Sequence, residues 1–535
     1  MTVLRGAERV GGEARVLVPD TVLPRSRWIR RRAAPRPSLR GRFARLDPLV
    51  ALTCAVAAAV FVLHGFDGVL SRDLGVYMYA GQQVADGVAP YAGILNRAGP
   101  LAHLLPGIGV AAGRWVGADD VLSARVLFMM LSVACVGTAY VLGRDLFRSR
   151  PAGLAAAATL LCFEGFIRYA TYGPREKTAM VLFLLCALLA VTHRRWLTAG
   201  CFIALATLTW QPALLAALAA AVTAALLAPA GTRLRALARI AIGGLVPAAV
   251  TVGCFVALGE LRTFLDDFLL INLQYTHQAP LLDRFGKTWG VLRDAYGWSL
   301  WVFFVGAVAL LVLSVVGVLR RSSRHDERTA ALAGTGVALV GGLVWSWTAF
   351  NSWPDAFVLL PAAAVGIGGL AALAGRLPRA WVALALVLAW VGVATAASFA
   401  YSVGERDQTL LQQRRDVAAV MELLPPGSRI LSVDAPQPLV LTGQTNASRF
   451  QVFSGGLTAY LQDTWPGGTH GYGEWVAAQA PTVIALGNAG APGWLDPVLA
   501  ESYHRLGRSN GWTWAVSDSV PLADREAIRA ALAQN

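Results

Sequence analysis

Two stretches beside predicted membrane spans combine carboxylates with cations. The first, residues 71–106 (SRDLGVYMYAGQQVADGVAPYAGILNRAGPLAHLLP), carries Asp73, and the second, residues 168–177 (RYATYGPREK), carries Glu176. A carboxylate can accept the proton of an attacking hydroxyl, and cations beside it can hold a departing phosphate. We therefore predict that Asp73 and Glu176 are catalytic. The candidate substrate-binding residues in these stretches and between them are Arg72, Tyr77, Arg97, His103, Arg168, Arg175 and Lys177.

Each of these positions also has a purely structural explanation. Asp is a preferred helix cap, so Asp73 could serve only to start a helix. Arg168, Arg175 and Lys177 could simply extend from the membrane to its interface, as long cationic side chains do. Tyr77 could belong to an aromatic belt instead of binding a sugar. Both explanations stay open for each position at this point.

The composition is that of an integral membrane protein. Of the 535 residues, 56% are hydrophobic and only 15% are charged, and the mean hydropathy is +0.53. The net charge of +14 comes from arginines clustered in short loops, without a basic patch interleaved with aromatics, so nucleic-acid binding is not expected. The six cysteines show neither CxxC pairs nor metal-ligand spacing. No metal ligands are predicted, and a divalent cation is left open as a cofactor.

Apolar runs predict a polytopic α-helical membrane protein with about eleven spans. The runs lie near residues 47–66, 120–143, 151–170, 178–192, 197–213, 213–230, 239–258, 298–319, 329–349, 355–374 and 380–401. With this count all arginine-rich loops fall on one side, which the positive-inside tendency assigns to the cytoplasm. Residues 1–46 are then a cytoplasmic, basic and partly disordered arm, and residues 47–401 form the transmembrane domain.

Residues 67–119 form the first outer loop in this topology. Apolar positions spaced by three and four residues predict a helix that begins at Asp73 and lies in the plane of the interface. Between Pro100 and Arg114, the next apolar run would reach only roughly 20 Å as a helix. The hydrocarbon core is about 30 Å thick, so we predict a second juxtamembrane or re-entrant helix there and not a span.

Residues 402–535 alternate strand-like with helix-like runs. These runs are residues 429–434, 438–443, 474–487, 494–508, 512–518 and 523–534. The alternation predicts a small extracytoplasmic α/β domain. Neither a GxGxxG motif nor a P-loop motif is present in the sequence.

The first outer loop and the segment after it resemble a known family. Asp73 is followed by GVYMYAGQQVADGVAPY and NRAGPL, then by a span with Ser123 and Arg125, a basic GRDLFRSR turn, and an outer motif with arginine and an acidic residue. This order is similar to that of the polytopic GT-C glycosyltransferases, in particular the bacterial relatives of protein O-mannosyltransferases and of lipid A aminoarabinose transferases. The resemblance covers roughly residues 47–200.

The resemblance implies inverting transfer of a sugar, with mannose favoured, from a polyprenyl-phosphate donor to an acceptor hydroxyl. The reaction would take place at the outer face of a bacterial plasma membrane, with a glycan, lipid or protein as acceptor. Asp73 would match the acidic residue of the first loop, which acts as base or orients the acceptor, and Glu176 would match the second acidic residue. Arg97 would stand where relatives often have lysine. In this chain Arg72 precedes Asp73 where many relatives have a second acidic residue.

Two other classes of function remain open from the sequence. One is a transporter or flippase of a lipid-linked sugar, and the other is a non-catalytic subunit of a membrane assembly. The predicted spans carry almost no ionisable residues at mid-membrane and no matched pair of interrupted helices, which disfavours a transporter. A subunit that binds prenyl phosphate without turning it over has the same sequence features as an enzyme.

Overall fold

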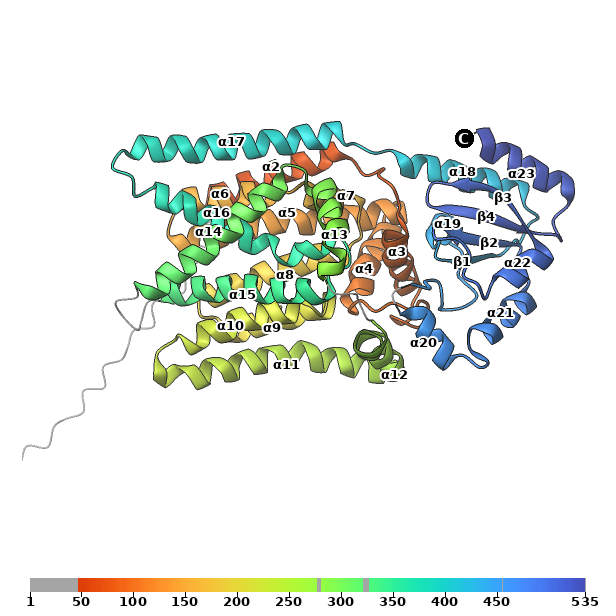
Figure 1. Cartoon of the computed structure of the whole chain (residues 1–535), viewed down its shortest axis with the longest axis horizontal. Helices are drawn as coiled ribbons and strands as arrows, with labels where there is room; N and C mark the ends of the chain where they lie inside the picture. Colours follow the sequence, from red (N-terminus) through yellow and green to blue (C-terminus); the bar gives the residue numbers. More distant parts are fainter. Residues whose placement is uncertain (1–46, 277–280, 321–326, 455, 535) are drawn as a thin grey trace, which may run out of the picture. The chain divides into compact units, whose positions relative to one another are not determined.

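The computed structural model describes residues 47–276, 281–320, 327–454 and 456–534. The predicted basic arm, residues 1–46, lies outside these ranges. Between residues 48 and 404 the chain is almost entirely helical, and long helices run side by side (Figure 1). The helices that coincide with predicted spans are α2 (Pro48–His64), α5 (Asp120–Phe147), α6 (Arg150–Leu161), α7 (Glu164–Tyr172), α8 (Glu176–Thr192), α9 (Trp196–Thr209), α10 (Ala213–Leu226), α11 (Arg233–Ala257), α14 (Ser299–Leu319), α15 (Glu327–Ala349), α16 (Leu360–Ala374) and α17 (Ala380–Gly404).

Short elements connect these helices. They are η1 (Ala230–Thr232), α12 (Leu261–Leu265), the π-helix η2 (Asp266–Tyr275), α13 (Leu281–Tyr296) and η3 (Trp353–Val358). Each of the eleven predicted spans therefore coincides with one helix or with two consecutive ones. Within the described residues, five helices are long and apolar enough to cross a membrane, or six if the bent pair α6–α7 counts as one span. The chain is a multi-pass membrane protein, and the exact number of spans stays a prediction.

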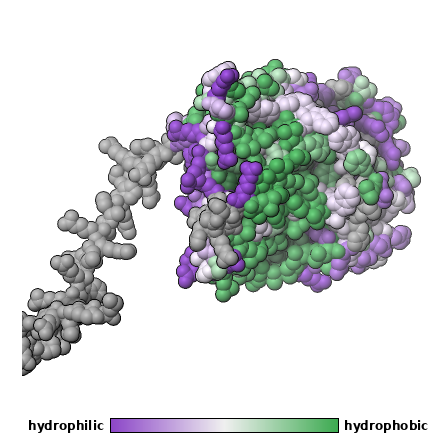
Figure 2. Space-filling model, turned by 60° about the vertical axis from the view of Figure 1, so that its left-hand side comes forward, coloured by the Kyte–Doolittle hydropathy of each residue, from purple (hydrophilic) through white to green (hydrophobic). Residues whose placement is uncertain are grey.

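Large apolar side chains on the outside of these helices form a hydrophobic surface. Figure 2 shows it as a broad green area bordered on both sides by hydrophilic residues. Exposed residues of this kind on α11, α14 and α17 include Leu245, Val250, Trp301, Val308, Val312, Leu384 and Leu388. A contiguous apolar surface of this extent needs a covering, which a bilayer provides.

Asp47 fixes one end of the helical bundle. Its carboxylate caps α2 by accepting from the N–H of Leu49, and it also accepts from the hydroxyl of Tyr140 at 2.7 Å. Arg144 and Arg150 form ion pairs with the same carboxylate, each at 3.2 Å. The start of α2 is thereby held against the end of α5 and the start of α6.

Helices α3 (Arg72–Ala85) and α4 (Leu101–Trp115) form the pair of helices predicted for residues 67–119. Figure 1 shows them at the end of the bundle, next to the sheet of the C-terminal portion. They approach closely, because a Cβ on Gly81 would lie 2.8 Å from the Cβ of Pro106. Helix α4 is not among the described helices that are long and apolar enough to span a membrane.

The C-terminal portion has the predicted α/β architecture. Four strands form a sheet in the order β1–β2–β4–β3, in which β1 and β2 are parallel and the other pairs antiparallel. The strands are β1 (Ile430–Val433), β2 (Val483–Gly487), β3 (Tyr503–Ser509) and β4 (Trp512–Ser517). The helices are α18 (Thr409–Leu423), α19 (Gln437–Thr442), α20 (Leu457–Thr464), α21 (Gly468–Gln479), α22 (Asp496–Ser502) and α23 (Leu522–Gln534).

Helix α3 packs between this portion and the bundle. Leu74 lies in one hydrophobic cluster with Trp514 of β4. The hydroxyl of Tyr79 accepts a hydrogen bond at 2.9 Å from the N–H of Asn446. The face of α3 that carries Tyr79 and the glutamines is therefore covered by the C-terminal portion and does not face open solvent.

Candidate functional site

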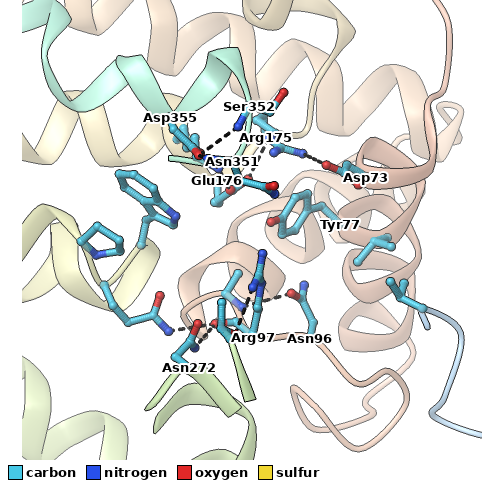
Figure 3. A pocket seen from close by; sticks show the side chains of 18 of the residues that line it. Asp73, Tyr77, Asn96, Arg97, Arg175, Glu176, Asn272, Asn351, Ser352 and Asp355 are labelled. Carbon is cyan, nitrogen blue, oxygen red and sulfur yellow. Dashed lines mark hydrogen bonds and ion pairs between the residues drawn. The ribbon is translucent and has the colours of Figure 1, made fainter. Parts of the chain in front are cut away.

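A cavity of about 640 Å³ opens at the end of the bundle beside α3, and we call it the α3 cavity. Its walls come from seven regions: the start of α3, the loop before α4, the start of α8, the α9–α10 turn, the π-helix η2, the segment from α15 to η3, and the segment that leads into α20 of the C-terminal portion. Figure 3 shows Asp73 and Tyr77 on one side, Arg97 with Asn272 on a second, and Glu176 with Asp355 on a third. Segments that are far apart in the sequence thus meet around one space.

Asp73 is the carboxylate most open to this cavity. Its side chain is 47% exposed, and its two oxygens accept from Arg175 at 2.9 Å and from Arg72 at 3.1 Å. Burial acts to raise the pKa of the Asp73 carboxyl, but the charges of Arg175 and Arg72 outweigh it and hold the pKa well below the usual range. Asp73 is therefore ionised while still accessible to a ligand.

Glu176 lies behind Asp73 in a buried network of charges. Its side chain is only 2% exposed, and its carboxylate contacts Arg175 at 3.2 Å and Lys177 at 2.6 Å. Lys177 also pairs with Asp355 at 3.2 Å and lies over the ring of Trp210. Because Glu176 has cations on both sides and little contact with the cavity, its geometry suits positioning of those cations better than proton transfer.

Replacing Lys177 by Met should destabilise the protein. The change would leave Asp355 and one oxygen of Glu176 buried without their cation, which typically costs about 3–5 kcal/mol. We expect the free energy of unfolding to fall by about this amount and the thermal midpoint in detergent to fall with it. The matched control is Lys287→Met, because Lys287 is the other lysine of the chain and is exposed. Equal midpoints for the two variants would contradict this account of the network.

Arg97 is the cavity cation that lacks a carboxylate partner. One guanidinium nitrogen donates to the hydroxyl of Thr276 at 3.1 Å, and Arg97 forms no ion pair with any residue in the described part of the chain. Its backbone carbonyl accepts from the side chains of Gln211 and Asn272, each at 2.8 Å. These bonds fix the backbone while the guanidinium points into the cavity (Figure 3).

The lining of the cavity carries an excess of positive charge. Its cations are Arg72, Arg97, Arg175 and Lys177, and its carboxylates are Asp73, Glu176 and Asp355. One positive charge is left uncompensated, and the ion pairs above assign it to Arg97. A cavity of this kind favours a ligand with a single negative charge.

The structure brings seven of the nine predicted site residues to this cavity, and two lie elsewhere. His103 is buried against the ring of Tyr91 at 4.6 Å, and burial lowers its pKa to about 3, so it is neutral at physiological pH. Arg168 does not line the cavity either, whereas its neighbour Tyr169 contacts Arg175. The expected phosphate contacts of His103 and Arg168 therefore have no support in this geometry.

Sequence reasoning missed several residues of the site. Asp355 forms a capping box with Ser352, and in the sequence a serine followed three residues later by an acidic residue indicates only the start of a helix. Asn272 lies in a π-helix, a rare element that is frequent at functional sites. One signal in the sequence pointed to the buried network: Lys177 is one of only two lysines in the chain, so its partners could have been sought among the acidic residues. Within the described residues, no group of three or more His, Cys, Asp and Glu side chains is placed to hold a metal ion.

Fold and site together define a multi-pass membrane protein with a charged cavity between its helical bundle and a C-terminal α/β portion. No family model and no curated protein sequence matches the chain. Two crystal structures of ArnT from Cupriavidus metallidurans, in the apo state and bound to undecaprenyl phosphate, are similar to it, each with a TM-score of 0.59. They are 13% and 14% identical, and the match covers 88% of this chain and 97% or 98% of ArnT.

A cryo-EM structure of the arabinofuranosyltransferase AftD from Mycobacteria also matches. Its TM-score is 0.48 at 14% identity, and the match covers 88% of this chain and 40% of AftD. The long match to ArnT shows that this chain has the same fold as ArnT, which confirms the predicted class of a polytopic helical membrane protein with a small C-terminal α/β portion.

Proposed function

We propose that the chain is a glycosyltransferase that moves a sugar from a polyprenyl-phosphate donor to an acceptor hydroxyl. The observation that carries the proposal is the α3 cavity, which contains a half-exposed carboxylate, Asp73, and an arginine, Arg97, that forms no ion pair among the residues the structure describes. The similarity to ArnT, which was solved with undecaprenyl phosphate, supports a lipid-linked donor. A prenyl chain stays in the bilayer, so its phosphate lies at headgroup depth, where a cavity at the end of the bundle can receive it.

The residues suggest a division of labour in this reaction. Arg97 binds the phosphate of the donor and stabilises the charge that grows on it as the bond from the sugar to the phosphate oxygen breaks. Asp73 accepts the proton of the acceptor hydroxyl as that oxygen bonds to the opposite face of the sugar, which inverts the anomeric centre. Asp73 then passes the proton to the released phosphate or to water. Glu176 holds Arg175 and Lys177 in place.

The low pKa of Asp73 fits a late proton transfer. A weakly basic carboxylate takes the proton only when the acceptor oxygen has become acidic through bonding to an electron-poor sugar. We propose mannose as the sugar and the outer face of a bacterial plasma membrane as the location, following the resemblance of the first outer loop. The N-terminus is then cytoplasmic, and the C-terminal portion is extracytoplasmic with the acceptor glycan, lipid or protein.

The pH dependence of transfer follows from the pKa of Asp73. A depressed pKa keeps the carboxylate ionised as the pH falls through the ordinary Asp range near about 3.9. We expect kcat/KM to show no loss assigned to Asp73 between pH 7 and about 3, where a carboxyl of ordinary pKa would already be mostly protonated. Kinetics across this range, with circular dichroism to verify folding at each pH, checks the expectation. An acid limb above about pH 4 that shifts in the Asp73→Glu variant would contradict it.

The proposal is tested with the full-length protein in lipid nanodiscs. Polyprenyl phosphates that carry radiolabelled mannose, glucose, galactose or arabinose are supplied in turn, and release of label from the lipid is measured with and without a cell-envelope extract. We expect turnover with at least one donor and without a second compartment. Movement of an intact lipid-linked sugar across proteoliposomes, without cleavage, would indicate a flippase. Binding without release of any label would indicate a non-catalytic subunit.

A further inference from the structure

A second cavity, of about 250 Å³, lies between the edge of the sheet and the start of α3, and we call it the sheet-edge cavity. Its lining residues are Val69, Ser71, Arg72, Asp434, Gln437, Asn488, Ala489, Asn510 and Gly511. Asp434 directly follows β1, Asn488 directly follows β2, and Asn510 and Gly511 form the turn between β3 and β4. The cavity is thus at the carboxyl ends of the two parallel strands, where open α/β sheets bind ligands.

Gln437 is the most informative residue of this cavity. Its side chain is fully buried at the start of α19, yet neither its amide oxygen nor its amide nitrogen has a hydrogen-bond partner in the described structure. Buried amides are normally paired, so this one is placed to donate to and accept from a ligand. Gly511 leaves the amide uncovered, because a Cβ there would lie 3.0 Å from the Gln437 nitrogen.

The chemistry of the lining favours a sugar. Side-chain amides, a carboxylate, a hydroxyl and a guanidinium supply both donors and acceptors, which hydroxyl groups need because each hydroxyl can donate and accept. The carboxylate of Asp434 disfavours an anion such as free phosphate. The volume is below the range of about 300–1,000 Å³ that is typical of sites for larger ligands. One monosaccharide ring suits it better than an oligosaccharide.

Arg72 joins this cavity to the α3 cavity, because it lines both. It contacts Asp434 at 3.5 Å on the sheet side and Asp73 at 3.1 Å on the other side. The side chain of Arg72 therefore separates a ring in the sheet-edge cavity from the carboxylate of Asp73. Gln413 connects two walls of the sheet-edge cavity. Its side-chain amide donates to the backbone carbonyl of Asn510 at 2.7 Å and to that of Leu70 at 3.0 Å.

We infer that the sheet-edge cavity is a subsite for one sugar ring of a carbohydrate acceptor, with Gln437 and Asn488 as its hydrogen-bonding residues. The inference rests on the proposed function and selects a glycan, or the sugar part of a glycolipid, among the possible acceptors. Arg72, which pairs with both Asp73 and Asp434, positions this ring relative to Asp73.

The test measures binding without any catalysis. Full-length protein in nanodiscs, free of donor, is titrated with methyl α-D-mannopyranoside, methyl α-D-glucopyranoside and methyl α-L-arabinofuranoside, and saturation-transfer NMR reports binding. The variant Gln437→Leu keeps the shape of the side chain and removes its amide, and Asn488→Ala changes an exposed residue that folding does not need. The matched control is Gln479→Leu, on α21 and outside the cavity. Binding of undecaprenyl phosphate is measured in parallel on every variant.

We expect at least one glycoside to bind the wild type and the control, and to bind about tenfold or more weakly to Gln437→Leu and Asn488→Ala. Unchanged glycoside binding in both variants, or no glycoside binding to the wild type, would overturn the inference. Undecaprenyl phosphate binding separates the two proposals. If it is absent while the glycosides bind as expected, the proposed function fails and the sugar site stands.

Discussion

Replacing Asp73 by Asn is expected to reduce sugar transfer by about 1,000-fold, within the range of about 100- to 10,000-fold that general bases contribute. Asn has nearly the same shape, but it cannot accept the acceptor proton. The reduction should appear in kcat, while KM for the donor stays within a few-fold, since the donor phosphate binds at Arg97 in our proposal. Single-turnover transfer in nanodiscs separates the two parameters.

The control for this variant is Asp86→Asn. Asp86 caps the other end of α3 and pairs with Arg114 at 2.5 Å, away from the α3 cavity. Its replacement also removes one ion-paired carboxylate from the same helix, and we expect transfer to be unchanged. Full activity of Asp73→Asn would contradict the assignment of Asp73 as base. Equal losses in the two variants would indicate that α3 needs its charges only for structure.

Replacing Arg97 by Ala is expected to weaken binding of polyprenyl phosphate by about 10- to 100-fold. A hydrogen bond to a charged group contributes about 1.5–3 kcal/mol, and each 1.4 kcal/mol is a factor of ten. The other cavity cations are already neutralised by carboxylates, so they cannot take over this role. Titration of undecaprenyl phosphate, followed through tryptophan fluorescence, measures the effect.

Arg97→Lys should recover part of this affinity, because a lysine keeps the charge and loses the forked geometry of the guanidinium. The matched control is Arg262→Ala, since Arg262 lies on α12, directly before the π-helix, and its side chain is 95% exposed. Unchanged binding in Arg97→Ala would refute the assignment of the excess charge. If only Lys177 variants lose affinity for undecaprenyl phosphate, the phosphate binds at the buried network and not at Arg97.

Local patterns predicted most of the helices, including the pair α3 and α4. The spacing of apolar residues located α3, and the run after Pro100 forms α4, whose placement outside the spans stays a prediction. These features depend on residues that are near one another in sequence. The charged residues of the loops were also brought together as expected around Asp73, because short connections keep the ends of α3 and α8 on one side of the bundle.

Local sequence patterns could not predict which particular side chains form ion pairs between segments that are distant in the sequence. The contact between Lys177 and Asp355 depends on how α8 and η3 pack, which periodicity does not encode. His103 was expected near the phosphate because it lies on an interfacial helix, but the aromatic ring of Tyr91 covers it. That Arg97 forms no ion pair within the described ranges became visible only when the carboxylates around it were placed.

The shared packing of α3 has a consequence for the evolution and engineering of this fold. Leu74 and Tyr79 belong to the same hydrophobic cluster as Trp512 and Trp514. If the chain were cut after residue 404, each fragment would expose apolar side chains that this cluster buries in the intact protein. The C-terminal portion and α3 therefore form one packing unit, and a chimera between relatives that exchanges the C-terminal portion must exchange α3 with it.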